Sequence, residues 1–250
     1  MKKLLFSLFI AILPAFALAA GGGALDHIDT DHTNKESLQR GVALFTNYCA
    51  GCHSTEYARY KRVAEDLKIP LNLYEENLIF TGARIGELML NSMDKAAAAN
   101  WFGAPPPDLT LETRLRGESW VYSYLRGFYK DDSRPLGVNN VVFPSVGMPH
   151  VMVNLQGLCA VEPRIGVSPS VEPLSGNINN ADVCPEYAIE GSMSSEEFDA
   201  AMYDLTNFLS YMGDPVKVER ERLGIFVLIF VAIFFIFAYL LNREYWKDVH

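Results

Sequence analysis

Two long apolar runs lie at opposite ends of the chain, and a mixed polar and apolar region separates them. Residues 4–18 form an apolar stretch that follows Lys2 and Lys3 and ends in the small-residue pattern of Ala17 and Ala19. Two positive charges, an apolar core and a small-residue cleavage site are typical of a secretory signal peptide. A retained N-terminal anchor is the alternative, but the run is short for a membrane span. We therefore predict a cleaved signal peptide over residues 1–19.

The second apolar run predicts a membrane anchor. Residues 224–241 carry no charge, and at about 1.5 Å per residue a helix of this length nearly crosses the hydrocarbon core of a bilayer. Basic side chains stand on both sides, and Tyr245 and Trp246 suit the membrane interface. A buried core helix is rarely apolar all round. An exported domain over residues 20–215 is then followed by an anchor region over 216–250, with its span at about 224–241 and a short cytoplasmic tail.

The region between these runs is predicted to be mainly helical, with long irregular connections. Asn34 can cap a helix whose apolar face is Leu38, Val42 and Phe45. The strongest helix signal is the Ser-x-x-Glu capping box at Ser194. An apolar stripe follows it, made of Phe198, Met202, Leu205, Leu209 and Met212, and Gly213 and Pro215 end it. Further helices are expected over residues 54–67, 87–99 and 120–129, and strand signals are few.

One motif carries specific chemistry. Cys49, Cys52 and His53 form the C-x-x-C-H sequence of c-type haem attachment. Two thiols at this spacing can add across the two vinyl groups of one haem, and the imidazole of the next residue can then bind the iron. A thioredoxin-like site would need a βαβ context, and a zinc site would need two more ligands nearby. We therefore predict one covalent haem c, with His53 as its proximal ligand.

The other two cysteines have a different setting. Cys159 and Cys184 bracket a stretch rich in Pro, Ser, Asn and Gly that shows no helical or strand periodicity. In an oxidising compartment two such cysteines most simply form a structural disulfide, although two free thiols remain the alternative. In the chain-entropy model, closing a loop of this size stabilises by roughly 3 kcal/mol.

The second iron ligand is less closely determined by the residues alone. Met148 lies in a non-periodic segment between Gly147 and Pro149, and such a segment can be laid across a haem face. A thioether opposite an imidazole raises the haem potential and favours electron transfer over oxygen chemistry. His150, another methionine or an open site are the alternatives at this point. Met202 and Met212 belong to the apolar stripe of the last soluble helix, which favours a packing role for them.

The net charge of the chain indicates which class of partner it can bind. The printed sequence has a net charge of −9, and removal of Lys2 and Lys3 with the signal makes it −11. Such a surface is unsuited to nucleic acid, and it would steer a basic protein partner.

The ordered motifs of the whole chain resemble the cytochrome c1 family, the haem subunits of the quinol–cytochrome c reductase (cytochrome bc1) complex. After the haem motif come residues 104–109 with three prolines, the stretch 114–118, the aromatic stretch 120–125, the segment 143–151 and one C-terminal span. The resemblance implies a class I cytochrome c-like haem domain with long insertions. It also implies that Met148 is the sixth ligand and that Arg116, or the nearby Arg114, contacts a haem propionate.

The resemblance further implies partners and location. The domain would take electrons from the Rieske iron–sulfur protein and pass them to a soluble or membrane-bound cytochrome c, while cytochrome b packs against the anchor in the lipid. On its own the chain would be an electron carrier, a non-catalytic subunit of the oxidoreductase. It would lie in the bacterial cytoplasmic membrane with the haem domain on the periplasmic side. The alternative is a membrane-anchored haem subunit of another respiratory oxidase or reductase.

Overall fold

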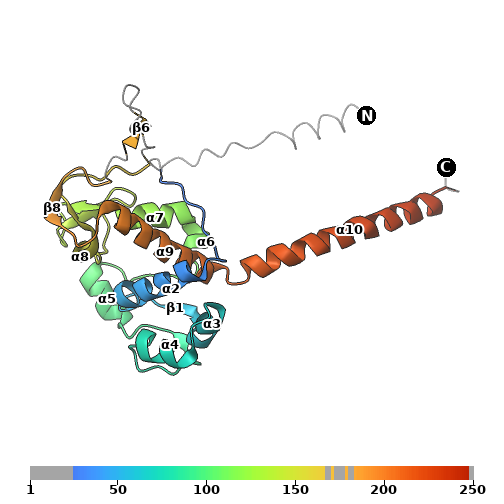
Figure 1. The fold of residues 1–250 in the computed structure, drawn as a ribbon, viewed down its shortest axis with the longest axis horizontal. Coiled ribbons are helices and arrows are strands. Elements are labelled where there is room, and N and C mark those ends of the chain that lie inside the picture. Colours follow the sequence, from blue (N-terminus) through green and yellow to red (C-terminus); the bar gives the residue numbers. More distant parts are fainter. Residues whose placement is uncertain (1–24, 167–169, 172–177, 180–182, 248–250) are drawn as a thin grey trace.

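The computed structural model describes residues 25–166, 170–171, 178–179 and 183–247 (Figure 1). The predicted signal peptide lies outside these residues and stays a prediction. The described part is mainly helical, as the pattern predicted. Its helices are α2 (Lys35–Leu44), the π-helical turn η1 (Phe45–Cys49), α3 (Tyr60–Asp66), α4 (Leu71–Leu78), α5 (Lys95–Phe102), α6 (Glu112–Arg116), α7 (Glu118–Arg126), α8 (Val153–Gln156), α9 (Ser195–Gly213) and α10 (Lys217–Tyr245).

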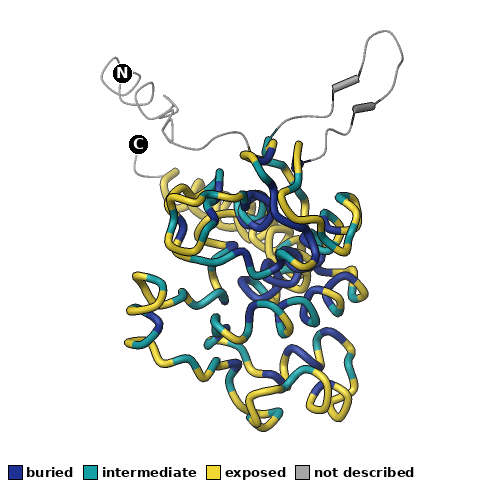
Figure 2. Tube along the Cα trace, turned by 90° about the vertical axis from the view of Figure 1, so that its left-hand side faces the viewer, coloured by how far each residue is buried: buried dark blue, intermediate teal, exposed yellow. Residues whose placement is uncertain are grey.

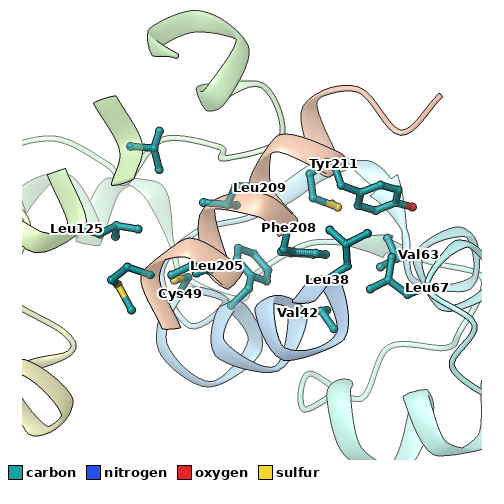
Figure 3. Close-up of a cluster of buried hydrophobic side chains, with 14 of the residues drawn as sticks. Leu38, Val42, Cys49, Val63, Leu67, Leu125, Leu205, Phe208, Leu209 and Tyr211 are labelled. Atoms are coloured by element: carbon teal, nitrogen blue, oxygen red, sulfur yellow. The ribbon is translucent and has the colours of Figure 1, made fainter. Parts of the chain in front are cut away.

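Two helices from opposite ends of the domain, α2 and α9, pack against each other at its centre. Both begin as the sequence predicted: the Asn34 side chain accepts from the backbone N–H of Ser37, and Ser194 and Glu197 form a reciprocal capping box. Leu38 and Val42 of α2 lie beside the α9 side chains in Figure 3, and the buried segments gather at this centre in Figure 2. Gly41 permits the close approach, because a Cβ there would lie 2.6 Å from the Cβ of Phe208.

A polar N-terminal segment ties α7 to α9. Its backbone N–H groups at Asp26 and Ile28 donate to serine hydroxyls of α7, at 3.0 and 3.3 Å. His32 Nε2 lies 2.8 Å from the hydroxyl of Ser210 on α9. The Arg126 guanidinium pairs with both Asp26 and Asp199. These contacts fix the orientation of α7 relative to α9.

Short strands connect the helices. They are β1 (Thr55–Arg59), β2 (Leu88–Met89), β3 (Phe128–Lys130), β4 (Val138–Asn140), β5 (Gly157–Cys159), β6 (Ser170–Val171), β7 (Ile178–Asn179) and β8 (Tyr187–Glu190). The order β4-β3-β5-β8 forms one sheet, in which only β3 and β5 run parallel. Cys159 and Cys184 are joined by a disulfide with a Cα–Cα distance of 5.4 Å, which confirms the predicted pairing.

Two helix predictions need correction. Residues 55–59 of the expected helix 54–67 form strand β1, which pairs with β2, and only Tyr60–Asp66 is helical. The expected helix 87–99 begins at Lys95 instead, because the Asp94 carboxylate accepts from the N–H of Ala97 and caps α5 there. The expected helix 120–129 is confirmed as α7 up to Arg126, after which β3 starts.

The C-terminal helix α10 contains the predicted span 224–241. It projects away from the domain (Figure 1), and none of its side chains is buried against the described part of the chain. Within that part it is the one helix long and apolar enough to cross a membrane. A helix that is apolar all round and unpacked needs lipid or another protein to cover it.

Candidate haem site

The local fold of the C-x-x-C-H motif follows directly from α2. Helix α2 passes into the π-helical turn η1, which ends at Cys49, and the N–H groups of Cys52 and His53 both donate to the Cys49 carbonyl at 3.0 and 2.9 Å. Cys49 is buried, Cys52 is half-buried, and both are free thiols. Burial raises the pKa of the Cys49 thiol to about 12, so this thiol stays protonated at neutral pH. The turn therefore carries two unbonded thiols, three residues apart in the sequence, at the end of a core helix.

The imidazole of His53 is oriented by the proline segment. Its Nδ1 lies 2.7 Å from the carbonyl oxygen of Pro107. A carbonyl can only accept, so Nδ1 carries the hydrogen and Nε2 keeps a free lone pair. Burial lowers the pKa of His53, which favours the neutral imidazole, the form that binds a metal.

Backbone contacts hold the proline segment beside the motif. The Leu109 N–H donates to the Ser54 carbonyl at 2.9 Å, and the Glu56 N–H donates to the Asp108 carboxylate at 2.7 Å. From the other side, the Asn91 amide donates to the Cys52 carbonyl at 2.5 Å. A cavity of about 310 Å³ opens here, lined by Cys52, Asn91, Met93 and the three prolines among others.

Met148 lies in the irregular segment that the sequence singled out. Its sulfur is 3.3 Å from the hydroxyl of Tyr124, and its side chain packs on a small apolar cluster that includes Phe128 and Val146. Gly147 is required here, because a Cβ would lie 2.7 Å from the backbone oxygen of Phe102. Phe102 ends α5, five residues before Pro107. The segment from α5 to the prolines thus contacts both the Met148 loop and the His53 ring.

A single buried asparagine, Asn140, joins that loop to helix α7. Its side-chain oxygen accepts from the N–H groups of Val142 and Phe143 at 2.9 and 3.2 Å. Its amide nitrogen donates to the carbonyl of Tyr124 at 2.8 Å. Asn140 is 1 % exposed, so none of these bonds has solvent in competition. The sequence pattern alone did not single out Asn140, although an asparagine before an irregular loop is a recognised turn signal.

Replacing Asn140 with alanine is expected to destabilise the protein by about 2–3 kcal/mol, since two N–H donors and a carbonyl lose their partner at a buried position. The melting temperature of the full chain in detergent should fall by about 4–12 °C. Asn77→Ala on exposed α4 removes one amide bond to the Leu73 carbonyl and is expected to change stability by less than about 0.5 kcal/mol. Equal effects of the two changes would contradict the role given to Asn140.

The two candidate arginines take different positions. The Arg116 guanidinium lies 4.4 Å from the ring centre of Trp120, and its Nε is 2.5 Å from the Glu112 carboxylate. Trp120 in turn stacks on Tyr124, with ring centres 5.1 Å apart and planes at 8°. Arg114 instead extends toward the end of α9, 3.5 Å from the Gly213 carbonyl. Of the two, Arg116 belongs to the aromatic group that reaches Met148.

His150, the alternative ligand, is engaged elsewhere. Its ring stacks on Phe128 with ring centres 4.9 Å apart, and its Nε2 lies 3.1 Å from the Gly157 carbonyl. Burial lowers the pKa of His150 to about 4. Met202 and Met212 are buried in the α9 core, and Met89 lies in β2 instead of on the expected helix. The surroundings of these residues indicate packing and structural roles.

The residues present fit a covalently attached haem. Two free thiols stand in one turn, a neutral imidazole keeps an open Nε2, and a thioether sulfur lies on a loop that contacts the same proline-bearing segment. Together with a helical domain and a terminal apolar helix, they define the class of membrane-anchored c-type cytochromes.

The chain belongs to the cytochrome c1 family, because the Cytochrome C1 family model matches residues 27–81 and 87–249. It is 47% identical to cytochrome c1 of Allochromatium vinosum over 251 residues, covering 100% of both chains. It is also 38% identical, over 252 residues and 100% of both chains, to a protein of Nitrosomonas europaea named ammonia monooxygenase gamma subunit. Cytochrome c1 of Rhodospirillum rubrum is 25% identical, with 86% of this chain and 83% of that protein covered.

Family membership confirms three predictions. The chain carries one covalently bound haem c, it is an electron-transfer protein anchored in a membrane, and it is the haem subunit of a cytochrome bc1 complex. These matches do not favour the alternative of a haem subunit from another oxidase or reductase.

Proposed function

We propose that this chain takes single electrons from the Rieske iron–sulfur protein and passes them to a cytochrome c. In this proposal Cys49 and Cys52 would hold the haem through two thioether bonds, and His53 and Met148 would bind its iron. The haem supplies a reversible one-electron Fe(III)/Fe(II) couple. The acceptor is a soluble or membrane-bound cytochrome c.

The observation that carries the proposal is the fixed imidazole of His53 within the motif. Because Nδ1 donates to the Pro107 carbonyl, the ring cannot turn, and its Nε2 faces away from that carbonyl. A hydrogen bond of this kind selects the tautomer and raises the basicity of the ligating nitrogen. The ring is thus oriented as a ligand before any metal is bound, and the two thiols precede it in the same turn.

The loop that carries the other proposed ligand, Met148, is also fixed in position. Its loop is fixed by Asn140 and by the contact of Gly147 with the end of α5, so the thioether has little freedom to move. A ligand set that keeps its geometry in both redox states lowers the rearrangement needed for each electron transfer. We assign Arg116 to a haem propionate. Its guanidinium lies over Trp120 and Phe143, and Trp120 stacks on Tyr124, which contacts Met148.

The proposed location follows from the two ends of the chain. A cleaved signal peptide over residues 1–19 exports the domain 20–215 to the periplasm, and helix α10 holds it at the bacterial cytoplasmic membrane with a cytoplasmic tail. Cytochrome b is the proposed partner for α10, whose large apolar side chains are all left uncovered within the described part of the chain. The full sequence is acidic, with a net charge of −9 before processing, which favours a basic acceptor.

The proposal is tested by isolating the full chain from a host that has haem-ligation machinery, using a mild detergent. We expect one haem per chain in a pyridine haemochrome assay, no loss of haem to acidic acetone, and co-purification of cytochrome b and the Rieske protein. The double change Cys49→Ala with Cys52→Ala should abolish covalent haem. The pair Cys159→Ala with Cys184→Ala removes the same number of sulfur atoms and should keep it. A colourless wild-type chain, or one isolated without cytochrome b, would reject the assignment.

A further inference from the structure

The contact between Tyr124 and Met148 is not used by the proposed function, yet it joins a hydroxyl directly to the ligand sulfur. The Tyr124 Oη lies 3.3 Å from the Met148 Sδ, with the hydroxyl as donor. Tyr124 is on α7, 24 residues earlier in the chain. The contact therefore exists only because the tertiary fold brings helix and loop together.

Two aromatic neighbours fix the position of the Tyr124 ring. Trp120 stacks on it with ring centres 5.1 Å apart, and Phe128 meets it edge-on at 5.4 Å. The backbone of Tyr124 is bonded to Asn140, which also holds the start of the Met148 loop. Neither partner can move far without breaking these contacts, so the hydroxyl stays aimed at the sulfur.

The chemistry of a thioether gives this contact a consequence. The sulfur has two lone pairs, so it can donate one to a metal and accept a hydrogen bond with the other. A hydrogen bond withdraws electron density from the sulfur and makes it a weaker donor. Ferric iron needs that donation more than ferrous iron does, and hydrogen bonds to ligands are among the means by which proteins set haem potentials.

We propose that Tyr124 is a positioning residue that orients the Met148 thioether and raises the haem potential through its hydrogen bond to the sulfur. The proposal rests on Met148 being an axial ligand, as proposed above. Trp120 stacks on the tyrosine ring, and the Arg116 guanidinium lies over the ring of Trp120. The successive contacts from the Arg116 guanidinium through Trp120 and Tyr124 thus restrict the motion of the Met148 sulfur.

The test is a redox titration of the Tyr124→Phe variant in the isolated complex, with the absorption band near 695 nm recorded on the oxidised form. The variant removes one oxygen atom and keeps the stacked ring. We expect the band to remain and the equilibrium constant for reduction to fall threefold to tenfold, which at 59 mV per tenfold is a drop of about 30–60 mV. Tyr122→Phe is the matched control on the same helix, because the Tyr122 ring lies against Arg126 instead; it should leave the potential unchanged.

A second variant separates the effect of the hydrogen bond from the effect of a change in packing. Incorporating 3-fluorotyrosine at position 124 keeps the hydroxyl and makes it a stronger donor, so the potential should rise where Tyr124→Phe lowers it. An unchanged potential in Tyr124→Phe, with the band near 695 nm present, would overturn the role of Tyr124 and leave Met148 as ligand. Absence of that band from the wild-type protein would instead reject Met148 ligation, and with it the proposed function.

Discussion

Replacing Met148 with leucine is expected to lower the haem potential by on the order of 0.1–0.3 V, a substantial part of the roughly 0.8 V over which axial ligands set haem potentials. Leucine has a similar volume to methionine, so the cluster with Phe128 and Val146 should stay packed. It offers no lone pair, however, and a harder donor such as water, which would take the place of the thioether, favours the ferric state. Quinol-dependent reduction of cytochrome c should stop while the haem stays covalently bound.

The measurement is a redox titration with spectra of the oxidised protein, together with quinol–cytochrome c reductase activity of the isolated complex. Met193→Leu is the matched control, since Met193 packs at the edge of the core just before α9 and lies outside the loop. It should keep both the potential and the activity. If Met148→Leu leaves the potential where it was, the sixth ligand is another group.

The change Gly41→Ala is expected to destabilise the protein by about 3 kcal/mol or more, because the added carbon meets both the backbone and the side chain of α9. It would lie 2.6 Å from the Phe208 Cβ and closer still to the Asp204 carbonyl oxygen. Alanine otherwise favours a helix over glycine by about 1 kcal/mol, so a loss of stability is a direct sign of the clash. The melting temperature of the full chain should fall by about 6–12 °C or more.

The effect should extend to haem binding, because α2 leads through η1 into Cys49. If α2 is pushed away from α9, the turn that carries the two thiols moves with it. Thermal unfolding and the yield of covalent haem measure the two consequences. Gly86→Ala is the control: among the described residues, no atom lies within 4 Å of a Cβ built there. A Gly41→Ala protein as stable as this control would mean that the helices do not approach as closely as described.

Local sequence rules determined the features that depend on residues close together in the chain. The capping box at Ser194, the Asn34 cap and the apolar character of residues 224–241 each follow from neighbours within a few residues, and the structure confirms the helices that they predicted. The C-x-x-C-H motif belongs to the same group, because its spacing is set by the covalent chemistry of one haem. The cysteine pair 159 and 184 could be matched because no other cysteines were left.

The same rules failed where a distant segment decided the outcome. Residues 55–59 form a strand because β2 lies beside them and the Asp108 carboxylate takes the Glu56 N–H. Arg114 and Arg116 could not be separated by sequence, since both lie on one short helix and only the packing of α6 on α9 sends them in different directions.

The sequence by itself thus determined the chemistry of this protein: two thiols and an imidazole for one haem, and an apolar membrane anchor. The tertiary structure decided which groups surround that chemistry, including the Pro107 carbonyl on His53, the Tyr124 hydroxyl on Met148 and the Asn140 amide that bonds to the Tyr124 backbone. The reason is physical. Covalent spacing and helix caps act over a few residues, whereas these hydrogen bonds join segments that only the packing of the core brings together.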